Sequence, residues 1–198
     1  MTACFMCFHR LKLSMGEAAQ QCDVLIIGAG PGGGSAGLHT SRAGLKTIIV
    51  EADPEVGTPV HCGECLSHIA IENLDLEIPD HVKALDVTGI RVIFPDGTEK
   101  LLTEKGYVLE KHLFERWLCD EAEKEGATLL LHHKVTSMER VYNSENKFSN
   151  WKIDGKGDGF PIECKAVIDA SGVTGAASKL LDMGTEVEVI AGFQYEIL

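Results

Sequence analysis

Three glycines and one glutamate form the clearest chemical pattern in this sequence. Gly28, Gly30 and Gly33 follow the spacing G-x-G-x-x-G and come directly after a run of apolar, mostly β-branched residues. In a loop from a strand to a helix, such glycines allow a tight turn, close approach of a pyrophosphate and close helix packing, in that order. Glu51 ends the next apolar run, at the distance where a carboxylate accepts hydrogen bonds from ribose hydroxyls. These residues predict a dinucleotide site for FAD or NAD, and they disfavour NADP because Glu51 would repel its 2′-phosphate.

A second chemical pattern is a cluster of thiols and imidazoles in residues 61–68. Its members are His61, Cys62, Cys65 and His68. Two cysteines at C-x-x-C spacing with flanking histidines are typical of a tetrahedral zinc site, and the same thiols could act as a redox dithiol. Another C-x-x-C stands at Cys4 and Cys7, but a whole unit of the fold would separate the two pairs, unlike in a compact zinc ribbon. We therefore expect no metal and interpret the segment as a loop beside a cofactor.

The other cysteines and histidines carry no catalytic pattern. Cys22, Cys119 and Cys164 fall in predicted strands or a predicted helix, where they are most simply small core residues. His132 and His133 are adjacent in an extended segment, so their side chains point to opposite faces. Seven cysteines is an odd number in a chain long enough to fold without disulfides, which indicates reduced thiols and a cytoplasmic protein.

The elements that position the glycine loop form a βαβ unit. Residues 22–28 have the continuous apolar character of a strand buried on both faces. Residues 35–43 predict a helix that ends at Gly44, and residues 46–51 predict a second buried strand. This order is typical of the parallel sheet of an α/β protein.

The later elements combine this α/β order with antiparallel strands. Residues 111–125 have the apolar spacing of a helix, with Leu113, Trp117 and Leu118 on one side, and a buried strand follows at 127–131. The sequence thus predicts an α/β fold with a parallel sheet, a β-meander and the beginning of another antiparallel sheet. The remaining predicted elements are a hairpin of 90–94 and 98–103, meander strands at 135–141, 150–153 and 162–164, a buried strand at 166–170, a helix from Ser171 through Leu181, and an alternating strand at 187–198.

Composition excludes several classes of protein. The 198 residues are 44% hydrophobic and 24% charged, as in a folded globular domain, which excludes disorder. The net charge is −12, and no segment concentrates enough basic residues to neutralise a run of phosphates, so we expect no nucleic-acid partner. A membrane-spanning helix needs about 20 consecutive apolar residues, and the sequence has no such stretch.

The order of elements and one loop motif resemble a known family. Residues 22–51, the hairpin, helix, strand and meander that follow, and a strand ending at Asp169 resemble the p-hydroxybenzoate hydroxylase-like flavoproteins. Within that superfamily, the segment EVGTPVHCGECLS at 55–67 is similar to a loop of the geranylgeranyl reductase family, which carries P-x-x-C-G-E-x-L-S. The resemblance spans about residues 22–198 and only the first half or so of a family member, so it implies an N-terminal fragment.

The resemblance implies a Rossmann-like FAD-binding domain and roles for individual positions. Lys111 stands where the family usually has an arginine beside FAD, which keeps the charge but loses the planar fork. No residue is identified as catalytic, and Cys62 is a candidate for shaping the substrate cavity beside the flavin. The implied contacts are Gly28, Gly30, Gly32 and Gly33 at the pyrophosphate, Glu51 at the ribose, Cys62 and Gly63 on the flavin side, Lys111 at the arginine position, and Val135 at the adenine.

The resemblance also implies a domain division and an activity. We expect a poorly ordered leader at 1–21, an FAD-binding domain at 22–85 and 106–185, a hairpin excursion toward the substrate domain at 86–105, and the start of an incomplete substrate domain at 186–198. The implied activity is FAD-dependent reduction of isoprenoid carbon–carbon double bonds in lipid or pigment precursors, with a prenyl-chain substrate and an unidentified electron donor. A flavin monooxygenase or halogenase of the same superfamily, or a non-catalytic nucleotide- or zinc-binding module, are the alternatives. The expected location is the cytoplasm, or the membrane periphery through the missing half.

Overall fold

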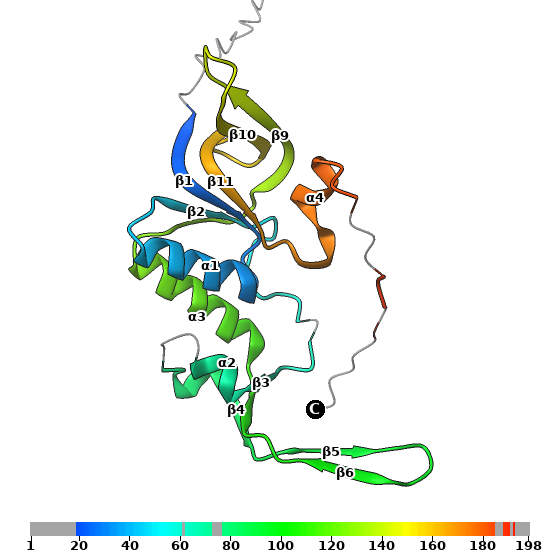
Figure 1. Ribbon diagram of the computed structural model, residues 1–198. Helices are drawn as coiled ribbons and strands as arrows, with labels where there is room; N and C mark the ends of the chain where they lie inside the picture. The colour runs from blue at the N-terminus through cyan, green and yellow to red at the C-terminus, as the bar shows by residue number, and fades with distance from the viewer. Residues whose placement is uncertain (1–18, 61, 73–76, 185–187, 191, 193–198) are drawn as a thin grey trace, which may run out of the picture.

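A computed structural model describes residues 19–60, 62–72, 77–184, 188–190 and 192 (Figure 1). Its main element is a six-stranded sheet with the order β8-β2-β1-β11-β10-β9. The central strand β1 pairs in parallel with β2 and β11, β2 pairs in parallel with β8, and β10 pairs antiparallel with both β11 and β9. The strands are β1 (Gln20–Ile27), β2 (Thr47–Val50), β8 (Thr128–Leu130), β9 (Lys134–Tyr142), β10 (Phe148–Lys156) and β11 (Ile162–Asp169).

Two helices cover one face of this sheet. Helix α1 (Pro31–Arg42) packs against α3 (Lys111–Lys124), and Figure 1 shows the two side by side next to the parallel strands. The buried side chains alternate along β1, because Ile26 contributes to the core under the helices while Leu25 contributes to the core on the opposite face. Both residues are fully buried. The continuous apolar run of β1 is therefore the result of burial on two faces.

The segment between β2 and α3 forms two smaller sheets. The order β3-β7-β4 makes an antiparallel three-stranded sheet, and the predicted hairpin is present as the pair β5 and β6, which projects from the rest of the chain in Figure 1. The sequence pattern did not predict β3, β4, β7 or the short helix α2. These elements are β3 (Cys65–Ser67), α2 (His68–Glu72), β4 (Lys83–Val87), β5 (Ile90–Ile93), β6 (Glu99–Leu102) and β7 (Gly106–Leu109).

Three sequence predictions were wrong in detail. The two strands predicted at 162–164 and 166–170 are one strand, β11, because the intervening Lys165 is exposed and forms an ion pair with Asp23 of β1 at 2.7 Å. The helix predicted from Ser171 is a 3₁₀ turn (Gly172–Thr174) followed by α4 (Ala176–Leu180), with a break where Gly175 has φ +53°. Leu113 is exposed, and its neighbour Phe114 takes the core position on α3.

The ends of the chain lie mostly outside the described residues. The predicted leader 1–21 is wrong at its boundary, because β1 begins at Gln20, which pairs with Ile162. The predicted strand at 187–198 includes only four described residues, 188–190 and 192, and none of these is in a strand. Among the described helices, none has the length and apolar character needed to span a membrane.

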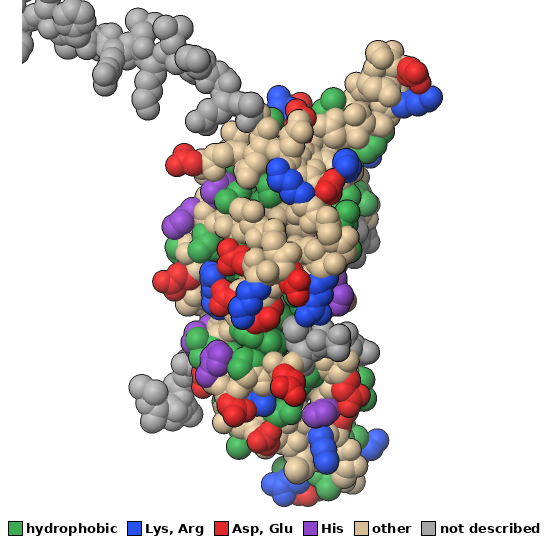
Figure 2. Space-filling model, turned by 90° about the vertical axis from the view of Figure 1, so that its left-hand side faces the viewer, with side chains coloured by type: hydrophobic (Ala, Val, Ile, Leu, Met, Phe, Trp, Pro, Cys, Tyr) green, Lys and Arg blue, Asp and Glu red, His purple; other side chains and the backbone are tan. Residues whose placement is uncertain are grey.

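Charges of opposite sign are mixed on the surface. On the face shown in Figure 2, Lys and Arg side chains lie among Asp and Glu side chains. On α3, Arg116 bridges Asp120 at 2.6 Å and Glu123 at 3.0 Å, so acidic side chains of this helix are partly neutralised by ion pairs along the helix.

The turn from β1 into α1 depends on the smallness of Gly33. A Cβ atom on Gly33 would overlap the carbonyl oxygen of Gly28, which is backbone and cannot move aside. We expect Gly33→Ala to lower the free energy of unfolding by about 3 kcal/mol or more. Urea denaturation followed by circular dichroism measures this loss. Gly32→Ala is the control, because its Cβ would lie 3.9 Å from the nearest atom outside the adjacent backbone, Ala170 Cβ; equal stability of the two variants would contradict the role of Gly33.

Candidate functional site

A cavity of about 740 Å³ lies at the carboxyl ends of the central parallel strands. Strand β2 follows β1 on one side and β11 pairs with β1 on the other, so the cavity is at the point where the strand order reverses. Ligands of open α/β sheets bind at such a point. Its volume is in the usual range for a small-molecule site. The lining includes Gly28, Gly30, Gly32, Glu51, Asp53, His133, Val135, Asp169, Ser171 and Thr174.

The glycine loop divides into residues that the fold needs and residues that face the cavity. Gly28 has φ +102°, and a Cβ there would come within 2.5 Å of the carbonyl oxygen of Ala170. Gly30 has no heavy atom within 4 Å of the position a Cβ would take, apart from its chain neighbours. The packing of the protein therefore explains Gly28 and Gly33, whereas at Gly30 the absent side chain leaves space open toward the cavity.

The first turn of α1 presents its amino end without a side-chain cap. Gly30 occupies the N-cap position, Pro31 begins the helix, and the first turn contains no acidic residue. The N–H groups of a first helical turn have no partner within the helix, and the helix dipole makes this end positive. The sequence therefore builds an anion-binding helix terminus at this edge of the cavity.

Glu51 connects two loops of the site. Its Oε2 accepts a hydrogen bond from the backbone N–H of Ala29 at 2.7 Å, and its Oε1 accepts one from the N–H of Asp53 at 3.1 Å. Each carboxylate oxygen has a second lone pair, so Glu51 can still accept hydrogen bonds from a ligand. The residue thus fixes the glycine loop against the end of β2 while it lines the cavity.

The turn between β8 and β9 contributes a further part of the lining. The backbone N–H of His133 donates to the carbonyl oxygen of Glu51 at 2.7 Å, and its ring contacts Phe160 at a centroid distance of 5.5 Å. The Nδ1 atom lies 2.6 Å from the carbonyl oxygen of Leu131, and Nε2 contacts the carbonyl oxygen of Asp158. His133 is therefore a structural residue at a strand end. The extended segment predicted for His132 and His133 is wrong, because residues 131 and 132 form a turn in which His132 has φ +59°. Val135 follows His133, buried, in the lining.

Asp169 ends β11 and organises the segment after it. Its Oδ1 accepts hydrogen bonds from Ser171 Oγ at 2.6 Å and Ser171 N at 3.1 Å, and its Oδ2 accepts from Ala177 N at 2.8 Å and Ser178 N at 3.2 Å. Burial raises the pKa of Asp169, but these hydrogen bonds outweigh it and hold the pKa below its ordinary value. The sequence analysis gave this residue no role. The signal was available, because an acid at the end of a buried parallel strand lies at the ligand edge of the sheet.

Three residues of the implied FAD site are not in the lining of this cavity. Lys111 begins α3, where its Nζ forms an ion pair with the buried carboxylate of Glu115. Cys62 is half-buried and its Sγ accepts a hydrogen bond from the N–H of Glu64 at 3.4 Å, and Gly63 is exposed. The structure thus brings the glycines, Glu51 and Val135 together and leaves Cys62, Gly63 and Lys111 apart from them.

The thiols and imidazoles of the proposed zinc alternative do not converge in the described residues. Cys65 is exposed on β3, and His68 at the start of α2 pairs with Glu72 at 3.3 Å. His61, Cys4 and Cys7 lie outside the described residues. Within the described part of the chain, no group of three or more His, Cys, Asp or Glu side chains is arranged to hold a metal ion.

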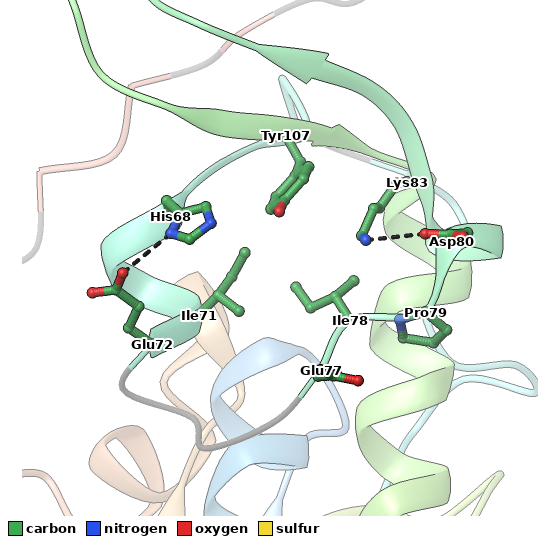
Figure 3. A pocket seen from close by; sticks show the side chains of 9 residues that line it. All are labelled: His68, Ile71, Glu72, Glu77, Ile78, Pro79, Asp80, Lys83 and Tyr107. Carbon is green, nitrogen blue, oxygen red and sulfur yellow. Dashed lines mark hydrogen bonds and ion pairs between the residues drawn. The ribbon is translucent and has the colours of Figure 1, made fainter.

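A cavity of about 920 Å³ lies elsewhere, between α2, residues 77–80 and strands β4 and β7 (Figure 3). Its cationic groups already have carboxylate partners, because His68 pairs with Glu72 and Lys83 pairs with Asp80 at 3.1 Å. Its apolar side consists of Ile71 and Ile78. Although it is larger, this cavity has no glycine loop and no unpaired cation among its described lining residues, so the smaller cavity is the candidate site.

Sequence comparison relates the chain to a family of redox enzymes. The sequence model of the FAD-dependent oxidoreductase family matches residues 23–180. The digeranylgeranylglycerophospholipid reductase of Methanothrix thermoacetophila is 31% identical over 184 residues, which cover 87% of this chain and 46% of that protein. The reductase of the same name from Thermoplasma acidophilum is 30% identical over 187 residues, or 89% and 46% of the two chains. The chain therefore spans about half the length of these relatives.

Solved structures support the same relationship. A geranylgeranyl bacteriochlorophyll reductase-like protein from Thermoplasma acidophilum superimposes with a TM-score of 0.72 at 29% identity, covering 88% of this chain and 44% of that chain. The flavin-dependent brominase Bmp2 superimposes with a TM-score of 0.61 at 22% identity, covering 78% and 39%. The second likeness shows a shared fold alone. The Rossmann-like α/β fold expected from the sequence is confirmed.

The hydrogen bonds of Asp169 make stability depend on pH. Because its pKa is lower in the folded than in the unfolded protein, ionised Asp169 stabilises the fold above the ordinary carboxyl range, about pH 4, and this stabilisation is lost as the pH falls through the folded pKa. We expect Asp169→Asn to lower the free energy of unfolding by about 1 kcal/mol at neutral pH and by less at about pH 3. Urea titrations at both pH values measure the difference. The exposed Asp182→Asn is the control; a deficit for Asp169→Asn that is equal at both pH values would contradict this account.

Proposed function

Because the chain belongs to the FAD-dependent oxidoreductases, we propose that the candidate site holds the ADP portion of FAD. The observation that carries this proposal is the open space at Gly30 beside the uncapped amino end of α1. A pyrophosphate there would meet backbone N–H groups and a positive helix end, with no side chain in its path. Gly32 and Gly33 extend this backbone surface into the first turn.

The residues around the loop fit the rest of the ADP group. Glu51 would accept the ribose hydroxyls through the lone pairs that Ala29 and Asp53 leave free. Val135, in the lining of the cavity, would contact the adenine through its backbone. The carboxylates of Glu51 and Asp53 would both repel a 2′-phosphate. This charge favours FAD over an NADP-type ligand.

We place the flavin side of the cofactor at the loop 55–67, which includes Cys62 and Gly63. The carbonyl oxygen of Glu64 accepts a hydrogen bond from Leu109 N at 2.9 Å, and its carboxylate accepts one from Lys111 N at 3.3 Å. Glu64 thus anchors the loop to β7 and to the start of α3, next to Cys62. We assign Lys111 to holding this loop through its backbone N–H, which donates to Glu64, because its side-chain charge is already paired with Glu115 of the same helix.

The activity that this site would serve is reduction of carbon–carbon double bonds in isoprenoid lipids. The named relatives are reductases of a digeranylgeranyl lipid, and they share the glycine-loop half of the protein. Bound FAD, once reduced by an external electron donor, would supply the hydride for such a reduction. The residues of this chain would hold the cofactor, orient its flavin through the 55–67 loop and exclude water. Domain ranges 22–85 and 106–185 would form the FAD-binding part, and 86–105 and 186–198 would contribute to substrate binding, in the cytoplasm at the membrane periphery.

The open space at Gly30 separates ligand binding from folding. We expect Gly30→Val to fold with a loss of at most about 1 kcal/mol, because a Cβ at this position has no heavy atom within 4 Å apart from its chain neighbours. We expect it to lose at least about tenfold in FAD affinity, because the branched side chain blocks the pyrophosphate. Quenching of flavin fluorescence measures affinity, and circular dichroism checks the fold. The same assay tests Glu51. We expect ADP to compete with FAD, and 2′-phospho-ADP to compete more weakly because Glu51 would repel its 2′-phosphate. Unchanged FAD affinity of the folded variant would refute the proposed site.

The reductase proposal is tested at Cys62. In a protein extended to the length of the relatives, we expect Cys62→Ser to retain FAD and to change the rate of reduction of a geranylgeranyl lipid or its product pattern, because this thiol lies on the flavin-side loop. Cys65→Ser is the matched control, since Cys65 is exposed on β3. Mass spectrometry of the lipid measures the number of double bonds reduced. A folded, FAD-containing extended protein that reduces no prenyl double bond would refute the activity while leaving the FAD site intact.

A further inference from the structure

Two buried thiols face each other across the centre of the main sheet. Cys22 of β1 and Cys164 of β11 are directly paired in the parallel register. Both belong to the core cluster on the face opposite α1 and α3. Neither residue is in the lining of the proposed FAD site. The proposed function therefore leaves this thiol pair without a role.

The spacing of the strands suits a bond between these two sulfurs. Neighbouring strands lie about 4.8 Å apart, and disulfides join residues whose Cα atoms are about 4.4–6.8 Å apart. The ion pair between Asp23 and Lys165, at 2.7 Å, joins the next residues along the same two strands. It holds the register in which the thiols meet.

The two thiols are chemically unequal. The hydrogen bond from Cys164 lowers the pKa of Cys22; burial opposes this shift, the charge of Lys46 assists it, and that of Asp23 opposes it. The same hydrogen bond, together with burial, raises the pKa of Cys164. Cys22 is therefore the better nucleophile, because the thiolate is the reactive form of cysteine. Cys164 is the donor that stabilises it.

A cavity lies beside the pair. Cys22 and Cys164 are among the residues that line a cavity of about 290 Å³, together with the exposed Gln21 and Lys165. Cys119 has a different environment: its thiol donates to the carbonyl oxygen of Ala29 at 3.5 Å, and burial raises its pKa to about 12. Two features thus set the pair apart from another buried cysteine in the same fold, namely a facing thiol and a cavity beside it.

We propose that Cys22 and Cys164 are a redox modification site, which a low-molecular-weight disulfide converts to a cross-strand disulfide. The thiolate of Cys22 attacks one sulfur of the reagent, whose S–S bond breaks and releases one thiol. Cys164 then loses its proton and attacks the Cys22 sulfur, which releases the second thiol. Two cysteine thiols are oxidised, and the reagent is reduced by two electrons to two thiols.

Peptide mapping of the 198-residue chain tests this proposal. The reduced, folded protein is incubated with glutathione disulfide, quenched with acid, alkylated and digested with trypsin without reduction. We expect a linked pair of peptides, residues 13–42 and 157–165, which disappears after treatment with dithiothreitol. Mass spectrometry identifies the pair and distinguishes it from links among the other cysteines.

Single substitutions provide the controls. Cys22→Ser and Cys164→Ser should each abolish the linked pair, whereas Cys119→Ser should leave its yield unchanged. The wild-type map stands by itself if a serine variant does not fold. The proposal is overturned if the folded protein gives only glutathione adducts or links between other cysteines, or if the linked pair forms only above the urea midpoint of unfolding.

Discussion

The close approach of backbone segments where β1, α1 and β11 meet is the constraint on which the rest of the structure depends. There is no space for a Cβ atom between Gly33 and the carbonyl of Gly28, or between Gly28 and the carbonyl of Ala170. This contact sets the direction of α1 as it leaves the sheet and brings the end of β11 beside the glycine loop. The amino end of α1 and the carboxyl ends of the parallel strands then share one cavity.

The cavity combines a positive helix end with acidic side chains, and hydrogen bonds from the backbone separate their roles. Glu51 joins the glycine loop to the end of β2, and Asp169 gathers the N–H groups of the segment 171–178. Each carboxylate is thereby fixed in place before any ligand binds. A ligand with a central pyrophosphate and a ribose on one side is complementary to this distribution of charge. The pyrophosphate would accept hydrogen bonds from N–H groups at the helix end, and the ribose hydroxyls would donate hydrogen bonds to a carboxylate.

The loop 55–67 is attached to β7 and α3 by different contacts. Its residues 65–67 pair with β7, and Glu64 accepts hydrogen bonds from Leu109 N and from Lys111 N at the start of α3, where Lys111 also forms an ion pair with Glu115 of the same helix. Glu115 is nine-tenths or more buried, and such a carboxylate requires a partner, which Lys111 supplies. A lysine at position 111, where the sequence resemblance implies an arginine, is consistent with this pairing, because an ammonium group needs only a point contact with one carboxylate.

The sequence by itself determined the parts of this protein that depend on local pattern. The glycine spacing, the continuous apolar runs and the turn at Pro95-Asp96-Gly97 predicted β1, α1, β2, the hairpin and α3, because strand burial, helix packing and turn formation are each encoded within a few neighbouring residues. The single strand β11 and the pairing of Cys22 with Cys164 were decided only by the tertiary structure. Each depends on which distant strand lies alongside, and Lys165, which interrupts an apolar run in the sequence, becomes compatible with a continuous strand only when Asp23 lies opposite it.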